Sequence, residues 1–160
     1  MATPGTLHLV CGKIAAGKST LCARLGAAPN TVTISEDAWL KALFGEEMKE
    51  AADYVRVQAK LLPPIGGLVA DLLRAGLDVV LDFQANTVRR RAWMKSVAEA
   101  AGAPHLLHWL DVPDETCRAR LHARNAAGGH DFAVTDEQFD LITSYFEPPS
   151  AEEGLEVVVE

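Results

Sequence analysis

The chain has 160 residues, of which 49% are hydrophobic and 23% are charged, a balance typical of one compact globular domain and not of a disordered protein. Fifteen lysines and arginines stand against 22 aspartates and glutamates, which gives a net charge of −7. No global positive field is therefore available to attract nucleic acid or an anionic membrane, although the net charge does not exclude a local basic groove.

Short apolar segments alternate with longer segments of helical spacing, a pattern that predicts a three-layer α/β domain around a five-stranded parallel sheet over residues 1–160. The predicted strands are Leu7 to Cys11, Thr31 to Ser35, Val79 to Asp82, Leu106 to Leu110 and Leu155 to Val159. The predicted helices are Lys18 to Leu25, Ala38 to Leu62, Ile65 to Arg74, Arg89 to Ala101, Asp114 to Ala123 and Asp136 to Phe146. We expect Pro63 and Pro64 to break the long helical stretch, and Gly76 and Gly102 to end helices in the left-handed conformation.

Residues 12–19 match the phosphate-binding motif G-x-x-x-x-G-K-[ST] between a predicted strand and a predicted helix. Glycines let successive backbone N–H groups, together with the helix N-terminus, face the phosphates of a nucleotide. Lys18 would add a positive charge, and Ser19 a hydroxyl ligand for Mg²⁺. The alternative is a plain glycine turn into a helix, but a chance match to the whole motif is rare. The residues predicted to bind ATP are Gly12, Lys13, Ile14, Ala15, Ala16, Gly17, Lys18, Ser19 and Thr20.

Two carboxylates follow the second predicted strand, at the sheet edge where open α/β folds bind ligands. Asp37 is the predicted general base, which would accept the proton of an acceptor hydroxyl as it attacks phosphorus. Glu36 is a second candidate for that role. The alternative is that Ser35 or Asp37 only caps the helix that follows.

The third predicted strand ends at Asp82 after an apolar run, as a Walker B strand does. Asp82 is therefore predicted to lie on the metal side of the site with Ser19. No Glu follows Asp82, which argues against ATP hydrolysis as the purpose of the site. The alternative is an aspartate that merely ends a strand.

Arg120 and Arg124 are four residues apart on a predicted helix and share one of its faces. The glycine-rich residues 125–129 follow them, so we predict a lid around residues 118–132 that closes over the phosphates. Its further candidates are His130 and Phe132. The alternative is a polar helix surface.

Three consecutive arginines, Arg89, Arg90 and Arg91, open the helix after the third strand. Neighbouring helical residues point in different directions, so at most one or two of them can face the site. Arg90 or Arg91 is the favoured candidate.

Taken together, these motifs resemble the small P-loop kinases that include chloramphenicol phosphotransferase, the zeta toxins and the kinase domain of polynucleotide kinase, with gluconate kinase and adenylate kinase more distant. The resemblance also rests on Asn86 and on the turn at residues 110–115. It implies a nucleoside-kinase-like fold, Asp37 as general base, Lys18 and Ser19 as phosphate and Mg²⁺ ligands, and Arg120 or Arg124 as lid arginines. Members often carry Arg three positions after that Asp, where this chain has Leu40, and this departure argues against an anionic or polynucleotide substrate.

We therefore expect transfer of the γ-phosphoryl group of ATP to a hydroxyl of a small molecule, with Mg²⁺ as cofactor. Two alternatives stay open: a polynucleotide 5′-hydroxyl kinase, and a regulatory module that binds ATP without an acceptor. The identity of the acceptor and the oligomeric state are not predicted.

The three cysteines, Cys11, Cys22 and Cys117, form no CxxC pair, which argues against a disulfide framework and a zinc site. The first residues do not resemble a signal peptide, and no apolar run approaches the roughly 18 residues of a membrane span. We expect a cytoplasmic protein that does not bind a membrane.

Overall fold

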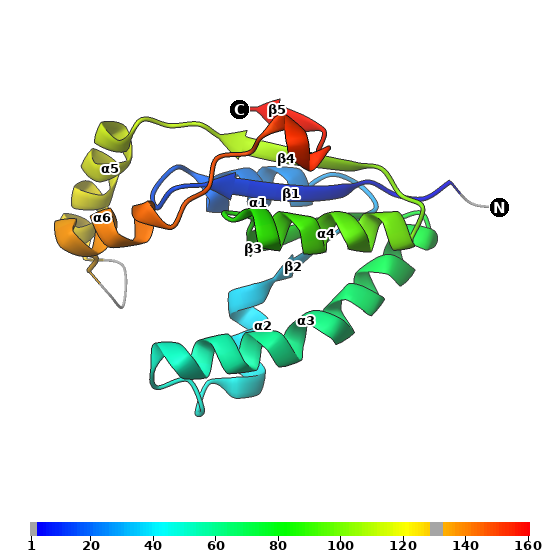
Figure 1. The fold of residues 1–160 in the computed structure, drawn as a ribbon, viewed down its shortest axis with the longest axis horizontal. Coiled ribbons are helices and arrows are strands. Elements are labelled where there is room, and N and C mark those ends of the chain that lie inside the picture. The colour runs from blue at the N-terminus through cyan, green and yellow to red at the C-terminus, as the bar shows by residue number, and fades with distance from the viewer. Residues whose placement is uncertain (1–2, 129–132) are drawn as a thin grey trace.

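The computed structural model describes residues 3–128 and 133–160 (Figure 1). Its strands are β1 (Leu7–Gly12), β2 (Thr31–Ser35), β3 (Asp78–Gln84), β4 (His105–Leu110) and β5 (Val157–Val159). Its helices are α1 (Lys18–Gly26), α2 (Glu36–Phe44), α3 (Ala51–Arg74), α4 (Val88–Ala100), α5 (Asp114–Ala127) and α6 (Asp136–Ser144), with the short 3-10 helix η1 (Ala151–Glu153) before β5. The predicted lid residues His130 and Phe132 lie outside the described residues.

The strands form one parallel sheet in the order β2-β3-β1-β4-β5, which confirms the predicted fold class. β1 is the central strand and pairs with β3 on one side and β4 on the other. Because all strands run the same way, the segments that follow β1, β2 and β3 meet at one edge of the sheet. These segments are the phosphate-binding loop, Glu36 and Asp37, and the residues after Gln84, because β3 continues two residues beyond the predicted end at Asp82.

Helices cover both faces of the sheet, and the side chains of β1 alternate between the two layers. Leu7, Leu9 and Cys11 pack in the large core cluster with α3 and α4, whereas Val10 packs on the opposite face with Leu21 of α1. In Figure 1, α5 and α6 lie together at one end of the sheet, while α2 and the first half of α3 extend below it.

The predicted break at Pro63 and Pro64 is wrong, because α3 continues through both prolines. A proline removes one helical hydrogen bond and usually bends the helix. Both prolines are exposed, and so are Ala59 and Lys60, whose carbonyls lose those bonds and can bind water instead. The helix is held by an unbroken buried stripe of Val57, Leu61, Ile65 and Val69, and Figure 1 shows it bending along its length.

The long predicted helix is interrupted elsewhere, between Phe44 and Ala51. There Glu50 and Asp53 form a capping box that begins α3. Gly76 and Gly102 have φ angles of 91° and 62°, as predicted for helix ends. The helix that carries Arg120 and Arg124 is longer than predicted and ends at Ala127, so most of the expected loop at 125–129 is helical.

Candidate functional site

The phosphate-binding loop leads from β1 into α1 as the motif predicts. Gly17 has a φ of 106°, a conformation that a side chain would oppose. The Nζ of Lys18 donates to the carbonyl oxygens of Gly12 at 2.5 Å and Lys13 at 3.0 Å. Burial lowers the pKa of Lys18, with nearby thiols and Asp82 opposing the shift. The lysine is therefore held over the loop at the N-terminus of α1, where a phosphate would compensate its charge.

Asn86, to which the sequence assigned no separate role, fixes the first glycine of this loop. Its Oδ1 accepts from the N–H of Gly12, and its Nδ2 donates to the carbonyl of Gly12, both at 3.0 Å. The carbonyl oxygen of Gly12 thus accepts hydrogen bonds from both Asn86 and Lys18. This contact joins segments 74 residues apart, so sequence spacing alone could not reveal it.

A cleft of about 530 Å³ lies on one side of Lys18 and is lined by the loop and by α5. The predicted nucleotide ligands Ile14, Ala15, Gly17, Lys18, Ser19 and Thr20 line it. Arg120 and Arg124 line it too, and Arg120 Nη1 donates to the carbonyl of Ala16 at 3.3 Å. The two arginines therefore share the face that meets the phosphate-binding loop.

Arg118, two residues before Arg120, serves a different purpose. It donates to Asp136 at 3.0 Å and to Asp140 at 2.6 Å, and its guanidinium lies 4.6 Å from the centre of the Phe139 ring. The hydrogen bonds to Asp140 and Asp136 raise the pKa of Arg118, and the three contacts together hold α6 against α5.

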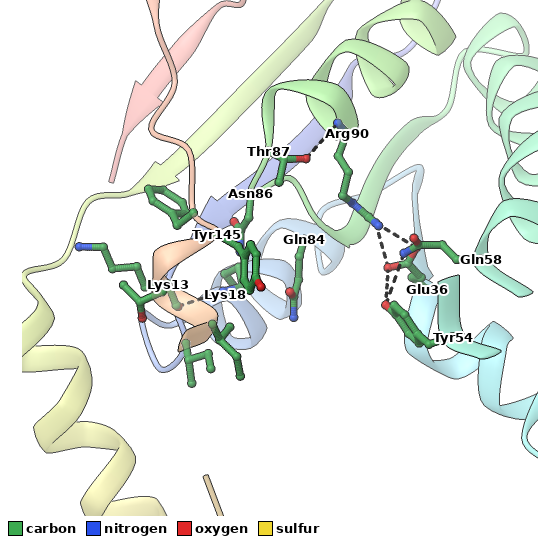
Figure 2. A pocket seen from close by; sticks show the side chains of 14 residues that line it. Lys13, Lys18, Glu36, Tyr54, Gln58, Gln84, Asn86, Thr87, Arg90 and Tyr145 are labelled. Atoms are coloured by element: carbon green, nitrogen blue, oxygen red, sulfur yellow. Dashed lines mark hydrogen bonds and ion pairs between the residues drawn. The ribbon is translucent and has the colours of Figure 1, made fainter. Parts of the chain in front are cut away.

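A second cavity of about 220 Å³ lies on the other side of Lys18, and Figure 2 shows its lining. Ile14, Lys18 and Gln84 line both cavities, so the two spaces meet at these residues. The remaining lining of the second cavity includes Glu36, Tyr54, Gln58, Arg90, Tyr145 and Phe146. This arrangement provides space for two ligands with a lysine between them.

Glu36 is a buried carboxylate in the wall of the second cavity. Arg90 Nη2 donates to both of its oxygens at 2.9 Å, and Gln58 Nε2 donates at 3.0 Å. The Tyr54 hydroxyl lies 3.4 Å from Glu36 Oε1. Burial and this carboxylate raise the pKa of Tyr54 to about 12. Figure 2 shows the four side chains as one hydrogen-bonded cluster.

Of the three consecutive arginines, Arg90 reaches the cavity and Arg91 does not. Arg91 is fully buried and donates to Glu153 at 2.7 Å and to the carbonyl of Ala85 at 2.9 Å. Arg89 is exposed. Arg91 therefore ties α4 to η1.

Asp37 is exposed at the start of α2. Ser35 is the N-cap of that helix, and its hydroxyl accepts from the N–H of Ala38 at 3.2 Å. Capping thus does not depend on Asp37, which removes one alternative for this residue. Leu40 is buried in the core, 1% exposed, and so contributes packing.

Asp82 lies half-buried at the same sheet edge. Burial is the main cause that raises the pKa of Asp82, and the nearby charge of Asp37 adds to it, whereas the Cys22 thiol and Lys18 lower it. Asp37 and Lys18 are therefore close enough to Asp82 to influence its titration.

Residues 7–149 match the model of a family described as AAA domain. No curated protein matches the sequence. No helix in the described part of the chain is long and apolar enough to cross a membrane.

Several solved structures share the fold. A candidate kinase from Chloroflexus aurantiacus aligns with a TM-score of 0.72 and 21% identity, over 100% of this chain and 86% of that one. An APS kinase from Mycobacterium tuberculosis, in complex with AMPPNP and APS, aligns with a TM-score of 0.62 and 21% identity, over 98% of this chain and 88% of that one. A gluconokinase from Sinorhizobium meliloti aligns with a TM-score of 0.59 and 17% identity, over 99% and 84%.

At these identities the structures establish a P-loop kinase-like fold, and the finer resemblance to chloramphenicol phosphotransferase, the zeta toxins and polynucleotide kinase stays an expectation. The family match extends over most of the chain, from the first strand to the segment after α6. The chain therefore belongs to the AAA domain family.

Proposed function

We propose that this protein transfers the γ-phosphoryl group of ATP to a hydroxyl group of a small molecule. The observation that carries the proposal is the pair of cavities that meet at Lys18, one lined by the phosphate-binding loop and one by polar and aromatic side chains. Two substrates bound in these cavities would have their reacting groups on either side of one lysine. Positioning of this kind supplies much of the rate enhancement in phosphoryl transfer.

On the nucleotide side, the N–H groups of the loop and the N-terminus of α1 would bind the phosphates. Lys18 would exchange its present carbonyl partners for the β- and γ-phosphate oxygens. Arg120 and Arg124 would compensate the charge that spreads over the transferred group. An APS kinase with this fold has been solved with AMPPNP and APS, which supports a nucleotide in the same role here.

The residues around Asp82 suit Mg²⁺. The Ser19 hydroxyl and the Asp82 carboxylate are oxygen donors of the kind this ion prefers. Burial and Asp37 make the charged form of Asp82 unfavourable in the free protein, and a divalent cation would relieve that cost. When bound, Mg²⁺ would neutralise charge on the phosphate oxygens.

Asp37 remains our proposed general base, and the surroundings of Glu36 support this choice. The Glu36 carboxylate already accepts hydrogen bonds from Arg90 and Gln58, so both of its oxygens are occupied in the cavity wall. Asp37 is exposed and is not the helix cap. In the reaction the acceptor hydroxyl would give its proton to Asp37 while its oxygen bonds to the γ-phosphorus, and the bond between that phosphorus and the departing ADP oxygen would break.

The first experiment tests the nucleotide half of the proposal. Saturating Mg·ATP should raise the unfolding free energy of the wild type by about 2.7 kcal/mol at a hundredfold excess over Kd. Lys18→Ala should lose most of this gain, whereas Lys60→Ala, an exposed lysine on α3, should keep it. Equal stabilisation of the wild type and Lys18→Ala would refute binding through the loop.

A further inference from the structure

We infer that the acceptor is an uncharged ring compound that carries several hydroxyl groups, and that the Glu36–Arg90 ion pair is the element that excludes anionic acceptors. This inference rests on the proposed function, because it concerns the acceptor side of the same site. It is carried by the charges, the size and the lining of the second cavity.

Two of the three cations that line the cavity are already paired with a carboxylate. Lys13 Nζ lies 2.5 Å from Asp114 Oδ1, and Arg90 is paired with Glu36. Lys18 also lines the nucleotide cleft, where its ammonium group would pair with the phosphates. Each positive charge on the described residues that line this cavity is therefore compensated by a carboxylate or, for Lys18, would be compensated by the phosphates, so an anionic acceptor would meet no net positive charge. The charge of Asp37 acts on Tyr54 in the wall of this cavity and would also repel such a group.

The ion pair also resists being opened by a ligand. The Arg90 and Glu36 side chains are 21% and 4% exposed, and one guanidinium nitrogen contacts both carboxylate oxygens at 2.9 Å. An anionic ligand that drew Arg90 away would leave the Glu36 carboxylate buried with only Gln58 and Tyr54 as donors. An unpaired buried charge is strongly unfavourable, so Arg90 stays paired with Glu36 when a ligand binds.

The size of the cavity restricts the acceptor further. Its volume of about 220 Å³ is below the range of sites for drug-sized ligands, which begins near 300 Å³. One substituted ring fits this space. The apolar part of the lining would contact the face of such a ring, and comprises Ile14, Ile142, Tyr54, Tyr145 and Phe146. Gln84 lines both cavities and could bind a hydroxyl beside the reacting one.

The experiment compares acceptors that share one ring and differ in charge. Transfer from γ-labelled ATP is measured to glucose, glucuronate and glucosamine. For the wild type, kcat/KM should be at least tenfold higher for the neutral member than for the charged members of a series. Higher activity with a charged member would overturn the inference but leave the kinase proposal standing. Transfer to none of these compounds, in a protein that Mg·ATP stabilises, would contradict both.

A substitution at Glu36 tests the role of the ion pair. Glu36→Gln leaves the charge of Arg90 unpaired, so the ratio of anionic to neutral kcat/KM should rise at least tenfold. Arg89→Gln, which changes an exposed neighbour outside this cavity, should leave the ratio unchanged. The double variant Glu36→Gln/Arg90→Gln removes both charges, so it should keep the preference for neutral acceptors. This variant replaces the single variant in the test if Glu36→Gln does not fold. An unchanged ratio in a folded Glu36→Gln variant, or a gain of anionic activity in the double variant, would show that the pair does not set the specificity.

Discussion

The backbone of Gly12 and the side-chain amide of Asn86 are joined by two reciprocal hydrogen bonds of 3.0 Å each. The amide thereby fixes the Gly12 carbonyl, whose oxygen also accepts a hydrogen bond from Lys18 Nζ at 2.5 Å. A loop that must present its N–H groups to a phosphate gains from being fixed before the ligand arrives. Asn86 is therefore a positioning residue for the phosphate-binding loop.

Asn86→Ala should weaken ATP binding on the order of tenfold and lower the unfolding free energy by about 1–3 kcal/mol, because both main-chain groups of Gly12 lose their partner. Calorimetric titration with Mg·ATP and denaturant unfolding measure the two effects. Asn86→Asp keeps the acceptor but loses the donor, so it should bind ATP as poorly as Asn86→Ala. Wild-type affinity in Asn86→Asp would mean that the donated bond is unimportant.

Arg120 and Arg118 offer a matched pair on one helix. Arg120 lines the nucleotide cleft, whereas Arg118 binds Asp136 and Asp140. We expect Arg120→Ala to lower kcat by about 10²–10³ with little change in Tm, in line with the loss of one charge-stabilising donor. Arg118→Ala should lower Tm and change kcat less. The reverse distribution of effects would show that Arg120 is structural.

The phosphate-binding loop and the sheet could be predicted from the sequence because their signals are local. A motif of eight residues fixes the loop, and apolar runs fix the strands to within a few residues of their observed ends. The predicted break at Pro63 and Pro64 failed for a tertiary reason. The buried stripe from Val57 to Val69 favours one continuous helix, and exposure of the freed carbonyls reduces the cost of the prolines.

The acceptor side of the site could not be predicted in the same way. Glu36 and Arg90 are 54 residues apart, and Glu36 and Gln58 are 22 apart, so only the packing of α3 and α4 near β2 brings them together. The sequence also could not distinguish Arg90 from Arg91. That choice depends on which face of α4 packs against Glu153, a residue near the C-terminus.

A chain of polar contacts between β1, β4 and the last residue should make stability depend on pH. His8 Nδ1 lies 2.9 Å from His108 Nε2, and His108 Nδ1 lies 2.6 Å from Glu160 Oε1. Burial, with the neighbouring His108, lowers the pKa of His8, and a hydrogen bond from His108 lowers the pKa of Glu160.

Because His8 titrates at lower pH in the folded state, the unfolded chain takes up its proton first as the pH falls below about 6.5. Stability should therefore fall from pH 7.5 to pH 5.5, and the lowered pKa of Glu160 should extend the loss below about pH 4.5. His8→Gln should reduce the fall in Tm between pH 7.5 and 5.5, while His122→Gln on the exposed surface of α5 should retain it. An identical pH dependence of Tm in the wild type and His8→Gln would contradict this account.

The most direct test of the proposed function is phosphoryl transfer by Asp37→Asn, measured as label passed from γ-labelled ATP to the best acceptor of the panel. Ser35 already caps α2, so the substitution should leave Tm and stabilisation by Mg·ATP unchanged. Loss of the general base should lower transfer by roughly 10²–10⁴. If the wild type passes label to the acceptor and Asp37→Asn retains more than about one tenth of that rate, Asp37 is not the base. Label released only as inorganic phosphate by the wild type would contradict the proposed kinase activity itself.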